Sequence, residues 1–130
     1  IALWLFMKKY AIAVVVYPEF LPEHSRPSQN NYVWAYTVTI TNIGTIAAQI
    51  ISRHWIITDA NGKVEEVKGL GIVGAQPLLR PGESFEYTSG CPLATPGGVM
   101  SGSYFCVAED GETFTAPIAA FNLTLPPTLH

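Results

Sequence analysis

The sequence predicts an all-β protein, an antiparallel β-sandwich of seven to eight strands. Apolar and polar residues alternate with a period of two in several segments, as in strands with one buried face. Glycine (11 residues) and proline (10 residues) punctuate the chain between these segments. No segment of the sequence has helical spacing of apolar residues over three turns. This combination is typical of many short strands joined by turns.

The clearest strand is predicted at residues 32–41. Five large side chains alternate along it with smaller residues, mostly alanine and threonine; the large ones are Tyr32, Trp34, Tyr36, Val38 and Ile40. A slip of one residue would turn all five toward water, so the register of this strand is firmly set.

Two predicted strands flank it. Residues 10–17 are β-branched and aromatic and form the first strand. A polar connection at residues 22–31 leads to the clearest strand, and the next strand covers residues 49–58. Its apolar set is Ile50, Trp55 and Ile57.

The second half of the chain continues in the same way. Asn61 and Gly62 predict a tight type I′ hairpin turn, which leads into a short, charged edge strand at residues 64–67. A strand at residues 83–88 follows, and residues 99–108 pair with residues 113–125 across an acidic, glycine-containing turn. Pro117 is expected to interrupt or bulge the last strand.

This number of strands in about 120 residues predicts an immunoglobulin-like or fibronectin type III-like sandwich. The Cys-Trp-Cys arrangement of immunoglobulin domains is absent from the sequence, which favours the fibronectin type III-like variant. An up-and-down barrel is the alternative. One core is predicted, with contributions from Trp34, Tyr36, Val38, Ile40, Trp55, Ile57, Phe85, Tyr104 and Phe121.

Residues 69–74 spell G-x-G-x-x-G, but the context does not suit dinucleotide binding. That motif requires a following helix, whereas Pro77 and Pro81 come next here. We expect residues 69–77 to form an ordered loop across the end of the sandwich, with a glycine at positive φ and no helix. Ile72 and Val73 are apolar and are expected to be covered.

Composition argues against several function classes. The net charge is −3 and the seven Lys and Arg residues are scattered, so no basic stripe for nucleic acid can form. Lysines interrupt the apolar N-terminal residues, which are also too few for a membrane span. We expect Met7 to be the natural start and residues 1–6 to be an expression or upstream-translation remnant, with residues 7–130 forming a single domain.

The sequence lacks a motif for catalysis or metal binding. Cys91 and Cys106 do not have zinc-site spacing and are expected to be reduced thiols in a cytoplasmic protein. The sequence holds no nucleophile-elbow string, and its histidines (His24, His54 and His130) are not at ligand spacing. We expect no enzyme activity, no cofactor and no metal site, and we expect His54 to be a partly buried, hydrogen-bonded sheet residue.

Arg53 is the most informative polar residue, because it lies in an otherwise apolar strand on the same face as Trp55. One interpretation is a structural ion pair with Glu65 or Glu66 across the hairpin. The other is an anion site in which Arg53 and the backbone amides of residues 69–74 converge on a phosphate or carboxylate. The candidate residues for this second interpretation are Arg53, Gly69, Gly71 and Gly74.

Several long motifs in order resemble the bacterial ApaG (CorD) family. They are residues 32–36, 52–59 and 69–77, residues 81–90, the spaced Met100, Gly102 and Tyr104, and the ending at residues 126–130. The resemblance runs from about residue 10 to residue 130. It implies a fibronectin type III-like sandwich and an association with cobalt resistance and with magnesium transport. Related domains in larger eukaryotic proteins act in protein–protein contacts.

Two function classes follow. The first is a non-enzymatic binding domain that recognises a protein partner through loops or through an edge strand such as residues 64–67. The second is a small-ligand sensor that binds pyrophosphate or a dinucleoside polyphosphate at the glycine-rich loop. The resemblance suggests this ligand class, because genes of the family neighbour a dinucleoside-polyphosphate hydrolase. In either class we expect a monomer or weak homodimer without nucleic-acid binding or membrane insertion.

Overall fold

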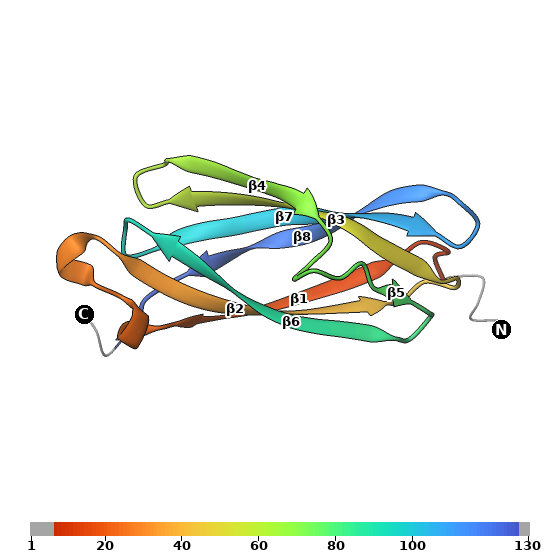
Figure 1. Ribbon diagram of the computed structural model, residues 1–130, viewed down its shortest axis with the longest axis horizontal. Coiled ribbons are helices and arrows are strands. Elements are labelled where there is room, and N and C mark those ends of the chain that lie inside the picture. Colours follow the sequence, from red (N-terminus) through yellow and green to blue (C-terminus); the bar gives the residue numbers. More distant parts are fainter. Residues whose placement is uncertain (1–6, 128–130) are drawn as a thin grey trace.

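The computed structural model describes residues 7–127; the expectations for residues 1–6 and His130 lie outside this range. Two antiparallel sheets face each other (Figure 1). One sheet has the order β1-β2-β6 and the other β4-β3-β7-β8, with β5 paired to β3. The strands are β1 (Ile12–Phe20), β2 (Tyr32–Asn42), β3 (Ala48–Asp59), β4 (Val64–Leu70), β5 (Leu78–Leu79), β6 (Ser84–Leu93), β7 (Gly98–Ala108) and β8 (Thr113–Leu123). This arrangement confirms the predicted fibronectin type III-like sandwich.

β2 shows the predicted alternation most clearly. Trp34, Tyr36, Val38 and Ile40 are all buried, and their neighbours along the strand are half-buried. The Trp34 indole also donates a hydrogen bond to the backbone oxygen of Thr124. Six of the nine predicted core residues belong to one buried cluster between the sheets. The other three, Ile57, Phe85 and Phe121, are partly buried and pack against this cluster.

β3 departs from strict alternation. Ile50 and Trp55 are both buried, although they are five positions apart and strict alternation would place them on opposite faces. The register with β7 shifts between Ile50 and Ser52, so Ile51 is an extra residue on β3. This bulge returns both apolar side chains to the core face. The predicted apolar set is therefore confirmed, and the bulge is the physical reason that it can form.

Prolines lie in strands at the sheet edges. β1 continues through Pro18, beyond its predicted end at residue 17, and β6 continues through Pro92. Both strands are edges of the three-stranded sheet, where a missing N–H group costs little. Pro117 lies within the edge strand β8, and a register shift follows it between Ile118 and Phe121. The last strand does contain a bulge, but at residues 119–120. Pro117 itself pairs in register with Ser103, so the prediction that Pro117 interrupts or bulges the strand is wrong.

Two single-turn 3₁₀ helices, η2 (Pro22–His24) and η3 (Pro27–Gln29), occupy the predicted polar connection. Within residues 7–127, no helix is long and apolar enough to cross a membrane. Cys91 and Cys106 are buried free thiols. Burial raises the pKa of each thiol to about 11.

Candidate functional site

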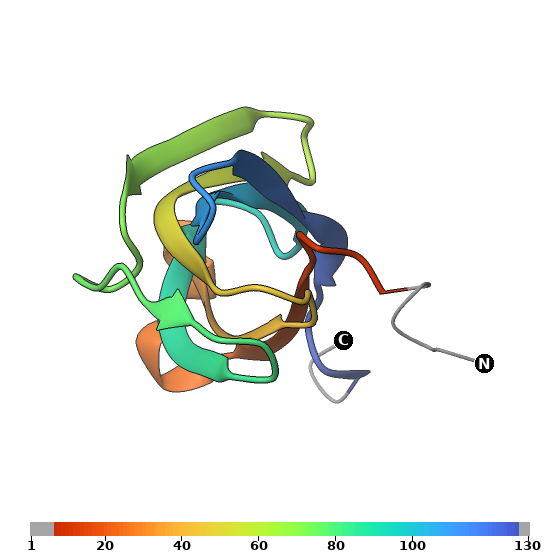
Figure 2. The ribbon, with the colours of Figure 1, turned by 90° about the vertical axis from the view of Figure 1, so that its right-hand side faces the viewer.

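The glycine-rich segment leaves β4 and returns to the same sheet through β5 (Figure 2). Gly71 and Gly74 have positive φ angles of 67° and 80°, as predicted, and no helix follows. Ile72 is fully buried, but Val73 is 61% exposed, so the prediction that both are covered is wrong for Val73. Reciprocal backbone hydrogen bonds between Ile72 and Ala75 close a tight turn, which pushes the Val73 side chain outward.

The chain crosses between the sheets later than predicted. β5 still pairs with β3, and the next strand, β6, belongs to the other sheet. The crossing is therefore made by residues 80–83 and not by residues 69–77. A backbone hydrogen bond from Glu83 N to Arg80 O closes this crossing turn.

Arg53 contacts the glycine-rich segment directly. Its Nη1 donates to the backbone oxygens of Leu70 and Gly71, each at 3.0 Å. Among the described residues, neither Glu65 nor Glu66 forms an ion pair with Arg53; Glu65 pairs with Lys63 and Glu66 with His54. The interpretation of Arg53 as one half of an Arg–Glu pair is therefore wrong, because carbonyl oxygens of the loop take the place of the carboxylate.

Gly69 explains how the guanidinium fits against β4. Gly69 pairs with Arg53 across the sheet, and the guanidinium lies over it. A Cβ atom at position 69 would come within 2.8 Å of Nη1 and 2.9 Å of Nη2. Real Cβ contacts of that length are essentially not found, so glycine at this position is what lets the guanidinium reach the carbonyl oxygens.

The predicted anion site combined Arg53 with amides of residues 69–74. Two of these amides already donate within the fold: Gly71 N bonds Ile51 O, and Ile72 N bonds Ala75 O. The segment presents carbonyl oxygens to Arg53, so the contact differs from a nest of amides around an anion. Gly74 lies within the turn that Ile72 and Ala75 close, and it is exposed. An anion at Arg53, Gly69, Gly71 and Gly74 stays a prediction.

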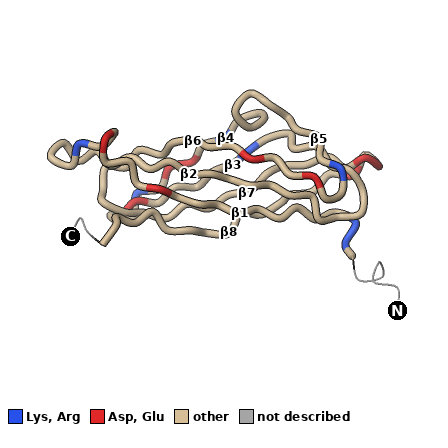
Figure 3. Tube along the Cα trace, turned by 90° about the horizontal axis from the view of Figure 1, so that it is seen from below, with Lys and Arg blue, Asp and Glu red and all other residues tan. Residues whose placement is uncertain are grey.

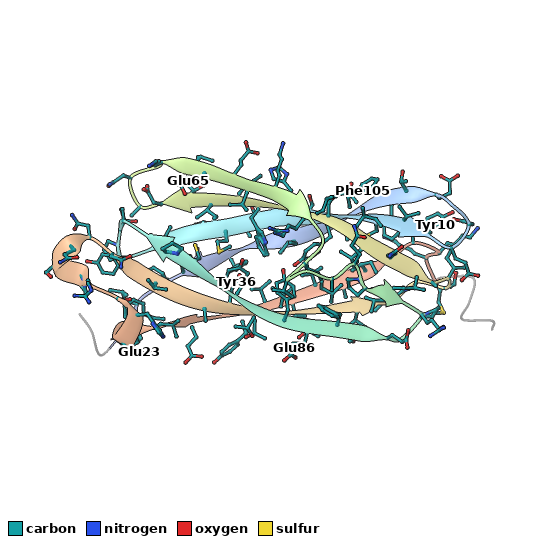
Figure 4. All side chains as sticks on the ribbon, in the orientation of Figure 1. Tyr10, Glu23, Tyr36, Glu65, Glu86 and Phe105 are labelled. Atoms are coloured by element: carbon teal, nitrogen blue, oxygen red, sulfur yellow. The ribbon has the colours of Figure 1, made fainter. Side chains whose placement is uncertain are left out.

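A cleft of about 350 Å³ opens between the two sheets on the side of β4 and β6. Arg53, Trp55 and Val67 line it from the five-stranded sheet. Tyr36 and Ser89 line it from the other sheet, and Glu65 lies at its rim with an exposed side chain. Figure 4 shows Glu65 on β4 and Tyr36 between the two layers. Arg53 lies beside Trp55, as predicted from the sequence. The cleft could not be predicted, because β4 and β6 belong to different sheets.

Phenol groups lie deep behind Arg53. The hydroxyls of Tyr87 and Tyr104 hydrogen-bond each other in the buried core. Burial raises the pKa of Tyr87 to about 12 and also raises the pKa of Tyr36, while the positive charge of Arg53 opposes both shifts. The charge of Arg53 is therefore close enough to these phenols to affect their pKa values, although burial is the larger cause of the shifts.

β4 is a free edge of the five-stranded sheet, as predicted, although it extends to Leu70. All its residues except Gly69 are exposed, and Leu70 is 79% exposed. Register places Leu70, Ser52 and Phe105 in one row across β4, β3 and β7. Phe105 is 41% exposed, so this row carries two exposed apolar side chains on the outer face of the sheet.

His54 is a half-buried sheet residue, as predicted, and its Nε2 lies 2.7 Å from Glu66 Oε1. No group of three or more metal-ligating side chains occurs among residues 7–127. Basic and acidic residues are dispersed along the trace (Figure 3). The described surface thus combines an edge strand, which carries both charged and exposed apolar side chains, with a neighbouring cleft that contains a single cation.

Comparison with known proteins finds relatives that all belong to one family. The family model of the ApaG domain matches residues 22–108. Protein ApaG from Bordetella pertussis is 61% identical over 124 residues, which cover 95% of each chain. Protein ApaG from Thiobacillus denitrificans is 62% identical over 123 residues, covering 95% of this chain and 97% of that one.

Two solved structures are similar to this chain. A crystal structure from Bordetella pertussis, described as that of an ApaA protein, has a TM-score of 0.91 at 60% identity and covers 93% of this chain and 98% of that chain. A protein from Archaeoglobus fulgidus has a TM-score of 0.51 at 8% identity, covers 89% and 98% of the two chains, and shares the fold alone. The matched domain and the high identity over nearly the whole length establish the family: this chain belongs to the ApaG family.

Proposed function

We propose that this protein is a non-enzymatic binding domain that recognises a protein partner by adding an extended segment of that partner to β4. The observation that supports this proposal best is the exposed β4 edge with its apolar side chains. An edge strand offers unpaired backbone N–H and C=O groups, and a partner strand can satisfy them. Alternate side chains of β4 then select the partner sequence.

The side chains of β4 suit such a partner. Val64 and Leu70 are 57% and 79% exposed on the outer face, at the two ends of the strand. Glu66 and Lys68 lie between them on the same face. The preferred partner segment therefore has apolar residues at both ends and charged residues in the middle. Any part in cobalt resistance or magnesium transport would act through this partner.

Affinity capture from the host cell tests the proposal when it compares matched variants. Leu70→Asp places a charge in the exposed apolar position on β4. Tyr17→Asp is the control, because Tyr17 is 72% exposed on β1 in the other sheet. We expect a specific partner to be recovered with the wild type and with Tyr17→Asp, and to be lost with Leu70→Asp.

Hydrogen exchange then tests the mode of binding. Addition of the partner is expected to slow amide exchange in residues 64–70, because strand addition pairs the free N–H groups of the edge. A partner that binds equally well to Leu70→Asp, or that protects β1 instead of β4, would contradict the proposal.

The phosphate-sensor alternative is tested separately. Gly71 and Gly74 adopt the positive φ angles that anion-binding turns use, which supports this alternative, whereas the Arg53 contacts to carbonyl oxygens weaken it. Titration of pyrophosphate into isotopically labelled protein distinguishes the two functions. Saturable NMR shifts confined to Arg53 and residues 69–74 would favour the sensor, and unchanged spectra would count against it.

A further inference from the structure

The cleft between β4 and β6 has the composition of a ligand site, independently of the protein-binding function proposed above. Its volume of about 350 Å³ falls within the range of small-molecule pockets, roughly 300–1,000 Å³. Trp55, Val67 and Met100 supply apolar walls, and Tyr36 and Ser89 supply hydroxyl groups. Such sites combine apolar walls with a few polar groups that fix the orientation of the ligand.

The guanidinium of Arg53 has donor capacity left for a ligand. In the described part of the chain it donates through Nη1 alone, to the two loop carbonyl oxygens. No buried side-chain nitrogen or oxygen among the described residues lacks a hydrogen-bond partner. Since Nε and Nη2 of Arg53 have no such partner, they are not buried and are reached by solvent. Together they form one edge of the planar guanidinium fork, which can donate a hydrogen bond to each oxygen of a carboxylate.

The contacts of Arg53 also fix its orientation before any ligand arrives. Two carbonyl oxygens hold Nη1, and Gly69 leaves the space that the guanidinium occupies. A side chain that is already ordered loses little rotamer freedom on binding. The free edge of the fork is thus preorganised.

The charges of the cleft select a monoanion. Among the described residues that line it, Arg53 is the one cation and Glu65 the one acid. Glu65 also lies close enough to Cys91 for its negative charge to raise the pKa of that thiol, although burial is the larger cause. A polyanion such as pyrophosphate would have to leave water for a site with one guanidinium and would be repelled by Glu65.

We propose that the cleft binds a small organic acid whose single carboxylate is held by Nε and Nη2 of Arg53 and whose aromatic or branched aliphatic body packs against Trp55 and Val67. The hydroxyl groups of Tyr36 and Ser89 are within the same cleft and orient the acid. The ligand class is set by this pairing of one preorganised guanidinium with apolar walls.

NMR titration of the full chain tests the proposal with three probes. Phenylacetate is the aromatic acid, isovalerate the branched aliphatic acid, and phenylacetamide the neutral isostere of the first. We expect saturable shifts from at least one acid, centred on the Trp55 indole, the Val67 methyls and the Met100 methyl, and no comparable shifts from phenylacetamide. Equal shifts from phenylacetamide, stronger binding of pyrophosphate, or no saturable shift with either acid would overturn the proposal.

Variants assign the role of Arg53. Arg53→Gln is expected to weaken binding of the acid by at least about tenfold, because it removes a charge-assisted hydrogen bond. Arg80→Gln is the matched control: Arg80 is exposed on a turn, pairs with Glu83, and lies outside the residues that line the cleft. Its variant should bind as the wild type does. An unchanged affinity in a folded Arg53→Gln protein would refute the role of Arg53.

Gly69→Ala keeps the charge of Arg53 but displaces its guanidinium. This second variant covers the case in which Arg53→Gln fails to fold, and its binding of the acid should also fall. Retention of wild-type affinity in folded Gly69→Ala would show that the position of the guanidinium does not matter, which contradicts the proposal.

Discussion

Replacement of Gly69 by alanine tests the structural account of Arg53 most directly. The new Cβ atom would lie 2.8 Å from Nη1, 2.9 Å from Cζ and 2.9 Å from Nη2 of Arg53. Because the guanidinium is the far end of a flexible side chain, it moves away and the strand backbone stays in place. Its hydrogen bonds to the oxygens of Leu70 and Gly71 are then lost.

The expected magnitude follows from two opposing effects. Hydrogen bonds that involve a charged group contribute about 1.5–3 kcal/mol each, and solvent access places these two at the lower end, for a loss of about 3 kcal/mol. Alanine in a strand is favoured over glycine by about 0.5–1 kcal/mol. Gly69→Ala should therefore lower the free energy of unfolding by about 2 kcal/mol.

A double-mutant cycle separates the two effects. In an Arg53→Met background there is no guanidinium to displace, so Gly69→Ala should be neutral or should stabilise by up to about 1 kcal/mol. The coupling energy between positions 53 and 69 should be about 2–3 kcal/mol. Gly90→Ala is a suitable control, because the new Cβ atom would meet only Trp34 O at 3.7 Å.

Urea unfolding monitored by tryptophan fluorescence gives the free energies, provided that the m value is the same in all variants. Equal destabilisation by Gly69→Ala in both Arg53 backgrounds would refute the reasoning, since the cost would then arise from the backbone and not from the guanidinium. No destabilisation in the wild-type background would refute it as well.

Three further predictions concern the core, the surface and the thiols. Trp34→Ala should cost on the order of 3–5 kcal/mol in urea unfolding, because Trp34 is 1% exposed and its removal leaves a cavity; an unchanged stability would refute its place in the core. Hydrogen bonding to Lys9 lowers the pKa of Asp110 to about 2. Asp110 therefore stabilises the fold above its unfolded pKa of about 4, and this stabilisation is lost as the pH falls toward 2. In urea unfolding, the midpoint of Asp110→Asn should fall less with decreasing pH than that of the wild type. Cys91 and Cys106 are buried with raised pKa values, so a thiol reagent should label them only as fast as the protein unfolds; rapid labelling of the native protein would contradict their burial.

Local sequence patterns were sufficient to predict most of the strands. The alternation in residues 32–41 predicted which side chains of β2 are buried, because one face of a strand must meet the core. Asn61 and Gly62 predicted the position of the hairpin before β4, and Gly62 has a positive φ of 83°. Asn61 does not have a positive φ, so the predicted type I′ turn is wrong. The strand ends were less predictable: β1 passes through Pro18 and β6 through Pro92, which only the edge positions of these strands permit.

The candidate site was predictable only in part. The sequence singled out Arg53 and the glycines after it, because a charge in an apolar strand and a glycine-rich segment each require a structural reason. The acceptors of Arg53 could not be predicted, since backbone carbonyl oxygens are present at every residue and leave no pattern in the sequence. Val73 was expected to be covered, and the tight turn closed by Ile72 and Ala75 exposes it instead.

The sequence by itself determined the class of fold, the face that each main strand buries, and the positions of the tight turns. These properties depend on side chains and turn residues that are neighbours along the chain. The tertiary structure alone decided that β4 and β6 border a cleft and that loop carbonyl oxygens hold the Arg53 guanidinium there. The Ile51 bulge, too, follows from the pairing of β3 with β7. Such features depend on contacts between strands that lie far apart in the sequence, and no local pattern encodes the distance between them.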